Sequence, residues 1–159
     1  MTSSTLPRLT SVHCRLAALS GAWSGEETLA PSPWSPGGTA WGRHVFGVAT
    51  GGFTVLQDYA QERDGAAALT GHGVLTADPA TDDVLWFWFD AIGHLPAAPS
   101  RGRFDAAGTT LSLQKTTPRG TQRATFALAG DTLHHRVEAR LGDAATFATL
   151  IVAAYMREG

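Results

Sequence analysis

Ten short, strand-like runs separated by tight turns constrain the fold of this chain more than any other feature. The runs are rich in Val, Thr, Phe and Trp, and the segments between them contain Gly, or Pro with Asp, as tight turns require. Connections this short can join only antiparallel neighbours, because a parallel crossover needs about a dozen residues or more. The sequence therefore predicts an up-and-down meander, with strands near 22–30, 39–49, 53–62, 67–77, 83–91, 101–105, 109–116, 121–129, 131–141 and 145–157.

Closure of the meander follows from its edges. A flat sheet of this length would leave two strands with unpaired backbone groups, and curling until the first and last strands pair removes both edges. Ahead of the strands, Leu9, Val12, Leu16 and Leu19 recur at helical spacing, and Gly21 stands where a helix would end. We therefore expect one all-β domain over residues 1–159, an antiparallel barrel (21–159) closed at one end by a short helix within 1–20.

Charge and cysteine usage narrow the partners and the compartment. The net charge is −2 and the charged residues are scattered, which argues against nucleic acid as a partner. The most apolar segment, Ala144–Met156, is shorter than the roughly 20 residues of a spanning helix, so no membrane partner is expected. Cys14 is the only cysteine, and Arg8, His13 and Arg15 interrupt the stretch where a signal peptide would lie. These features predict a cytoplasmic protein.

Strand alternation assigns two histidines to the barrel lumen. In the run 131–141, His135 shares its parity with Leu133 and Val137, so its side chain should point inward. In the run 39–49, His44 shares its parity with Phe46 and should also point inward.

Three further residues complete the predicted ligand-binding set of His44, His72, Trp88, Asp90 and His135. His72 lies between two glycines within a strand, and such glycines often mark a bulge or the close approach of a ligand. Asp90 ends a strongly apolar strand and shares its parity with Trp88. A buried His72 and Asp90 could also act as an acid/base pair on a bound substrate, or could simply satisfy one another in the wall.

Metal and cofactor motifs are missing from the sequence. His134 and His135 are adjacent, so on a strand they point to opposite faces, and no His-x-His pair occurs. The remaining route to a metal site is convergence of His44, His72 and His135 across the lumen. Phosphate loops, dinucleotide-binding glycine motifs and nucleophile elbows are also missing. The prediction is therefore a site without metal or cofactor.

Several short motifs resemble a known group of barrels. The run Gly21-Ala-Trp23-Ser-Gly25 looks like the Gly-x-Trp start of lipocalins and of nitrobindin-like haem barrels. Together with Gly71-His72-Gly73-Val74, Asp78-Pro79-Ala80-Thr81, Trp88-Phe89-Asp90 and Gly102-x-Phe104-Asp105, it resembles an uncharacterised bacterial family of lipocalin-like and nitrobindin-like barrels of the calycin type. The resemblance implies a lumen that holds a small apolar ligand, and an Arg157 side chain stacked on Trp23.

The same resemblance raises haem as an alternative. Haem-binding relatives take their iron ligand from a histidine on a strand near the C-terminus, but 145–157 contains none. Only His135, on the preceding run, could substitute.

The sequence thus favours a binding protein whose lumen takes a small apolar or aromatic molecule. The alternatives are an enzyme that uses His72 and Asp90, a haem-binding protein, and an interaction protein with a packed lumen. Val84–Asp90 and Phe147–Met156 are apolar on both faces, which further predicts a homodimer that covers their outer sides.

Overall fold

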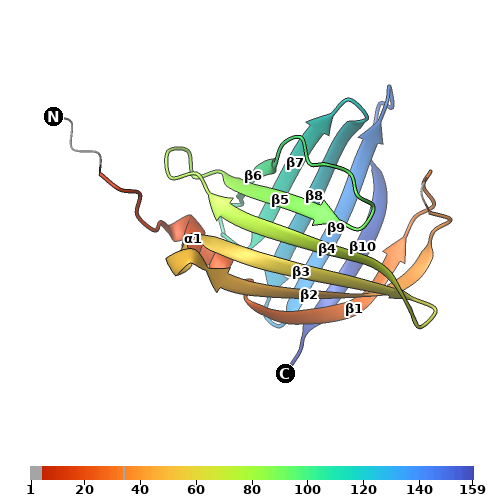
Figure 1. The fold of residues 1–159 in the computed structure, drawn as a ribbon, viewed down its shortest axis with the longest axis horizontal. Coiled ribbons are helices and arrows are strands. Elements are labelled where there is room, and N and C mark those ends of the chain that lie inside the picture. The colour runs from red at the N-terminus through yellow and green to blue at the C-terminus, as the bar shows by residue number, and fades with distance from the viewer. Residues whose placement is uncertain (1–4, 34) are drawn as a thin grey trace.

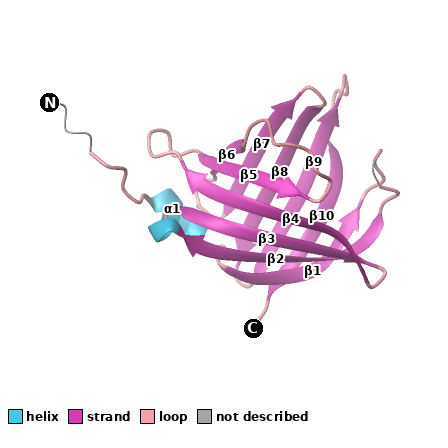
Figure 2. Cartoon of the chain, in the orientation of Figure 1, coloured by secondary structure: helices cyan, strands magenta, loops and turns pink. Residues whose placement is uncertain are grey.

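A closed antiparallel barrel of ten strands, with one helix at its end, forms the molecule (Figures 1 and 2). The computed structural model describes residues 5–33 and 35–159. The predicted fold class is confirmed, and the strand boundaries differ from expectation by only a few residues. The strands are β1 (Gly21–Leu29), β2 (Gly38–Ala49), β3 (Thr54–Arg63), β4 (Ala66–Ala77), β5 (Val84–Asp90), β6 (Ser100–Phe104), β7 (Thr110–Thr117), β8 (Gly120–Ala129), β9 (Thr132–Leu141) and β10 (Ala148–Arg157).

Each strand pairs with its neighbours in the chain, and β1 closes the cylinder by pairing with β10. The seam between β5 and β6 is the shortest, since its register runs only from Val84 opposite Gly102 to Trp86 opposite Ser100. Beyond Trp86, β5 continues to Asp90, and the chain crosses 91–99 before β6 begins. The barrel wall therefore has its fewest strand-to-strand hydrogen bonds beside the second half of β5.

The helix α1 (Ser11–Ala17) is shorter than the apolar stripe suggested. Val12 and Leu16 are buried from the helix and Leu19 from the turn that follows it, whereas Leu9 is half exposed. The helix packs on β3, β4 and the 3-10 turn η1 (Thr50–Gly52), so it covers one end of the cylinder. We call this the closed end, and the opposite end the mouth.

Trp23 anchors the closed end. Its side chain is fully buried, and its indole N–H donates to the carbonyl of Leu19 at 2.9 Å. The Arg157 guanidinium lies 4.1 Å from the Trp23 ring centroid and donates to the carbonyl of Ser20 at 2.7 Å. The predicted stacking of Arg157 on Trp23 is confirmed. The apolar core begins here and includes Leu16, Phe46, Val55, Leu75, Val84, Leu111, Phe126 and Leu133.

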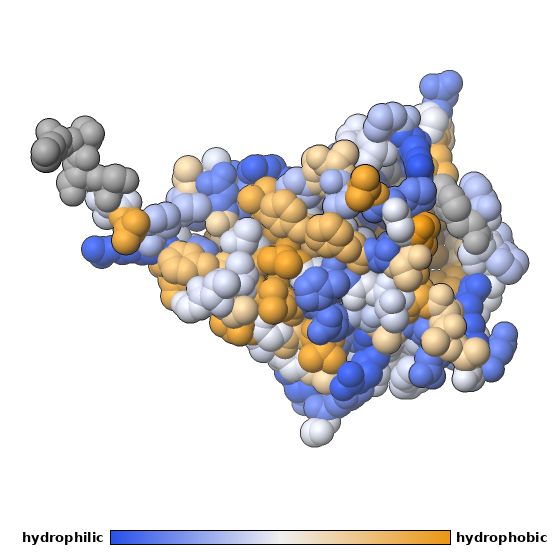
Figure 3. Space-filling view, viewed as in Figure 1, coloured by the Kyte–Doolittle hydropathy of each residue, from blue (hydrophilic) through white to orange (hydrophobic). Residues whose placement is uncertain are grey.

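The outer wall carries hydrophobic side chains that remain exposed. Phe87 and Phe89 point outward from β5, and hydrophobic side chains gather on the face over β4 and β5 (Figure 3). The homodimer that this feature suggested stays a prediction. Within the described part of the chain, no helix is both long and apolar enough to cross a bilayer.

Candidate functional site

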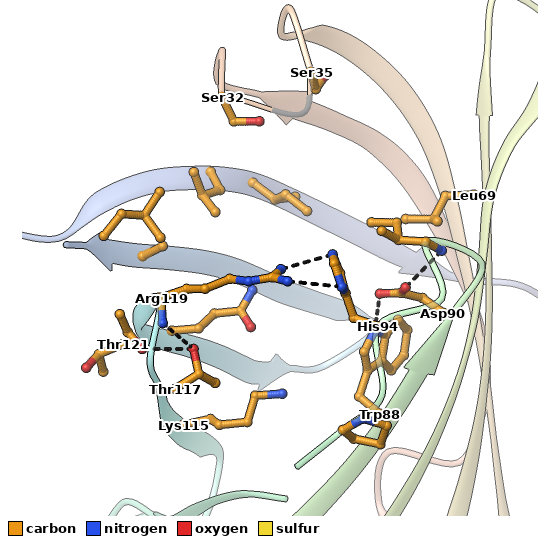
Figure 4. Close-up of a pocket in the computed structure, with 18 of the residues that line it drawn as sticks. Ser32, Ser35, Leu69, Trp88, Asp90, His94, Lys115, Thr117, Arg119 and Thr121 are labelled. Atoms are coloured by element: carbon orange, nitrogen blue, oxygen red, sulfur yellow. Dashed lines mark hydrogen bonds between the residues drawn. The ribbon is translucent and has the colours of Figure 1, made fainter. Parts of the chain in front are cut away.

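The inward side chains line two adjoining chambers of the barrel lumen. The inner chamber, about 200 Å³, lies among residues from the middle of the strands. The outer chamber, about 840 Å³, opens at the mouth (Figure 4). The chambers adjoin, and seven residues line both of them: Leu69, Trp88, Asp90, Ile92, Lys115, Gln122 and Ile151.

A buried carboxylate, that of Glu27 on β1, borders the inner chamber. It is fully buried and accepts hydrogen bonds from the hydroxyls of Tyr59 (2.9 Å to each carboxylate oxygen) and Tyr155 (2.6 Å). The amide nitrogen of Gln61 donates to the same carboxylate at 2.6 Å. These three donors replace the water that the carboxylate loses on burial, and they come from β3 and β10 on the two sides of β1 and β2.

The two tyrosines are held as hydrogen-bond donors. Burial, followed by the nearby Glu27 carboxylate, raises the pKa of both Tyr59 and Tyr155 far above the ordinary value. Both hydroxyls therefore stay protonated at neutral pH and keep donating to Glu27.

Glycines make room for the large side chains of the chamber wall. A Cβ atom at Gly42 would overlap the Glu27 carboxylate, and one at Gly71 would overlap the Trp88 ring. A Cβ atom at Gly73 would likewise meet the indole nitrogen of Trp86. These close approaches explain glycine in the middle of β2 and β4, where it otherwise weakens a strand.

His44, from β2, is a neutral donor with a fixed tautomer. Trp86 donates its indole N–H to Oε1 of Gln57 at 2.9 Å, which turns the Gln57 amide nitrogen toward Nδ1 of His44 at 3.0 Å. Nδ1 therefore accepts, and the proton of the neutral ring lies on Nε2. Burial, with a smaller effect of His135, holds the pKa of His44 well below 6.5. Nε2 is buried and has no partner among the described residues.

His135, from β9, holds the opposite tautomer. Its Nδ1 lies 3.0 Å from the carbonyl of Thr125, which can only accept, so Nδ1 carries the proton. Burial lowers the pKa of His135 to about 4. Its ring stacks on Phe126, with centroids 4.3 Å apart, and lies 5.7 Å from the His44 ring. The inner chamber thus holds one imidazole donor, on His44, and one imidazole acceptor, Nε2 of His135.

The mouth carries a second group of polar residues (Figure 4). Asp90 accepts from the Trp88 indole N–H at 3.0 Å and from the backbone N–H of Ile92 at 3.0 Å, which fixes the start of the 91–99 segment. Arg119, on the hairpin between β7 and β8, lies 3.0 Å from Nε2 of His94 in that segment. Lys115 also lines both chambers.

The structure brings together four of the five residues chosen from sequence and excludes the fifth. His44, Trp88, Asp90 and His135 all line the inner chamber. The expectation that His72 faces the lumen is wrong, because its neighbours Gly71 and Gly73 take the inward positions of β4.

His72 instead belongs to the outer wall. Its imidazole is 47% exposed, and Nδ1 lies 2.8 Å from Oδ1 of Asp58 on β3. An acid/base pair of His72 and Asp90 is therefore ruled out, since the two side chains lie on opposite faces of the sheet. Convergence of His44, His72 and His135 on one metal ion fails for the same reason.

Five polar residues around the buried carboxylate and His44 were missed from sequence: Glu27, Gln57, Tyr59, Gln61 and Tyr155. Strand alternation could have found the first, because Glu27 shares its parity with Trp23 in a strand that was correctly predicted. Gln57 and Tyr59 likewise alternate with outward Asp58 on β3.

Haem fits these residues poorly. The chamber that contains His135 is only about 200 Å³, smaller than the roughly 300–1,000 Å³ of ordinary ligand pockets. The His135 ring also stacks on Phe126 and on Tyr155, with centroids 4.3 Å and 6.2 Å away. The surroundings of His135 therefore do not suit a haem ligand.

Comparison with known proteins places the chain in a family by sequence. No protein of curated function matches it. The model of a family described as "Protein of unknown function (DUF1579)" matches residues 8–157, which include the helix and all ten strands. The chain therefore belongs to the DUF1579 family.

Proposed function

We propose that this protein binds a small, mostly apolar or aromatic molecule in its barrel lumen. The observation that carries the proposal is the two-chambered cavity, with an outer volume of about 840 Å³ that lies within the usual range of ligand pockets. Its wall offers flat aromatic surface, and its deepest part offers a few fixed polar groups. That combination is typical of sites that bury the body of a ligand and orient it by one polar end.

The aromatic wall selects the body of the ligand. Trp86 and Trp88 lie with their ring centroids 5.2 Å apart, and Tyr59 lies 6.0 Å from Trp88. A planar ring that enters from the mouth can stack on these faces, because offset and edge-to-face contacts between rings are favourable.

The inner polar groups select one end of the ligand. His44 offers an unpartnered N–H, and a ligand atom that accepts this hydrogen bond would satisfy a buried donor. We further propose that the barrel is of the lipocalin-like or nitrobindin-like kind and that the protein is cytoplasmic.

The test is a fluorescence titration with N-phenyl-1-naphthylamine, a neutral aromatic probe that brightens in apolar surroundings. Val137 lines the inner chamber, and Val152 on the adjacent strand points outward, so Val137→Phe and Val152→Phe add the same volume inside and outside. We expect micromolar binding by the parent protein and by Val152→Phe, and at least about tenfold weaker binding by Val137→Phe. Equal affinity in all three proteins, or no binding by the parent, would refute lumen binding.

A further inference from the structure

Lys115 is the only lysine in the chain, and its side chain points into the ligand cavity. It lies on β7 in the inward row that begins with Leu111 and Leu113. Figure 4 shows the side chain extending into the outer chamber rather than away from the barrel. All eleven other basic residues of the chain are arginines.

The cations of the outer chamber lack acidic partners. Among the described residues, Lys115 makes no ion pair, and the Arg119 guanidinium contacts the His94 imidazole and pairs with no carboxylate. Arg63 donates to the carbonyl of Gly37 at 3.1 Å. Asp90 is the only carboxylate that lines the outer chamber, and its two oxygens already accept from Trp88 and Ile92, whereas Glu27 lines the inner chamber and accepts from Tyr59, Tyr155 and Gln61.

Several arginines of the outer wall, by contrast, have acidic partners. Arg43 pairs with Glu158, Arg101 with Asp83, and Arg123 with Glu138. These three cations on the outside of the barrel therefore form ion pairs, whereas the cations that line the chamber form none with the described residues. Three cations and one carboxylate line the outer chamber, which leaves an excess of positive charge at the end where a ligand would enter.

We propose that the ligand is an amphipathic organic anion whose acidic group pairs with the Lys115 ammonium. The apolar body would lie against Trp86 and Trp88, and the anionic end would lie toward the mouth, near Arg119. This inference rests on the proposed function, because it names the class of molecule that the lumen takes. A carboxylate, a sulfonate and a phosphate share the required chemistry, since each offers charged oxygen acceptors to an ammonium donor.

The first experiment compares two probes with the same aromatic body. 1-Anilinonaphthalene-8-sulfonate carries one negative charge, and N-phenyl-1-naphthylamine carries none. We expect Lys115→Gln to weaken binding of the sulfonate by at least about tenfold, the usual effect of losing a hydrogen bond to a charged group, and to leave the neutral probe unchanged. Lys115→Arg should retain the preference. Arg136→Gln removes a charge from the outer wall and should change neither affinity.

The outcomes separate the two proposals. If the neutral probe binds and Lys115→Gln leaves the affinity ratio of the two probes unchanged, the anion inference fails and lumen binding stands. If neither probe binds the parent protein, lumen binding fails and the anion inference fails with it.

A second experiment uses the fact that the chain has a single lysine. Reductive methylation with ¹³C-formaldehyde labels Lys115 and the terminal amine only, and the Lys115 resonance is identified by its loss in Lys115→Arg. Decanoate or decyl phosphate should shift this resonance. The anion that causes the larger shift identifies the preferred acidic group. Decanol should leave it in place. An equal shift with decanol, or no shift with either anion, would overturn the assignment.

Discussion

Trp23 and Trp88 show how one barrel wall serves two purposes. Trp23, at the closed end, is fully buried, bonded to the main chain and covered by Arg157. Trp88, toward the mouth, is only partly buried, is bonded to Asp90 and lines an open chamber. Both are inward residues of regular strands. The difference lies in their neighbours: Leu, Val and Phe side chains fill the lumen beside α1, whereas polar side chains such as Glu27, Gln57 and Tyr59 line the inner chamber.

The largest expected effect is a difference in stability between alanine variants of these two tryptophans. Trp23→Ala should lower the free energy of unfolding by about 3–5 kcal/mol, because it leaves a cavity in close-packed surroundings. Trp88→Ala should cost about 1 kcal/mol and weaken binding of N-phenyl-1-naphthylamine. Urea unfolding measures both losses. Equal destabilisation by the two substitutions would show that the mouth end is packed like the closed end.

Acid should act on the inner chamber next. His135 has a folded pKa of about 4 against 6.5 when unfolded, so the unfolded state binds more protons between these values. The neutral His135 therefore stabilises the folded protein above about pH 6.5. As the pH falls to about 4, the free energy of unfolding decreases by about 3 kcal/mol. The lowered pKa of His44 acts in the same direction.

Urea unfolding at a series of pH values measures how steeply the free energy of unfolding falls with decreasing pH, and this dependence is the slope to compare between variants. His135→Gln should flatten it, whereas His134→Gln, on the outer face of the same strand, should not. The same slope in both variants would contradict the burial of a neutral His135.

The Glu27 network should show a smaller effect. Tyr155→Phe and Tyr59→Phe each remove one hydroxyl that donates to the carboxylate, and each should cost about 1–3 kcal/mol. Thermal or urea unfolding measures the loss. In the double variant the two losses should not add, because both donors serve one acceptor. Additive losses below about 0.5 kcal/mol each would show that Glu27 is solvated.

His72 should show the smallest effect. His72→Ala removes an exposed pair with Asp58 and should change stability by less than about 0.5 kcal/mol. Binding of N-phenyl-1-naphthylamine should not change, whereas His44→Ala should alter it. A loss of binding in His72→Ala would return this residue to the lumen.

Much of the barrel could be predicted from sequence, because turn residues mark every connection and alternation marks the inward face. His44 and His135 followed from that alternation. The prediction for His72 was wrong because its neighbours Gly71 and Gly73 have no side chains that would show which face of the strand is inward. The rings that occupy the space beside these glycines belong to Trp88 and Trp86 on β5.

Alternation marks Glu27 as an inward residue of its own strand, but the groups that donate hydrogen bonds to it could not be predicted from that strand. Its donors lie 32, 34 and 128 residues away, and only the closed topology brings them together. The unpaired state of Lys115 is equally a property of the assembled chamber.

The location of the ligand inside the barrel is tested most directly by ¹⁹F NMR of protein labelled with 5-fluorotryptophan and titrated with N-phenyl-1-naphthylamine. Single Trp→Phe variants assign the five resonances. We predict that the resonances of Trp86 and Trp88 shift on binding and that those of Trp23, at the closed end, and Trp41, on the outer wall, do not. Shifts confined to Trp41, or no shift of Trp86 and Trp88 at saturation, would contradict a ligand site inside the barrel.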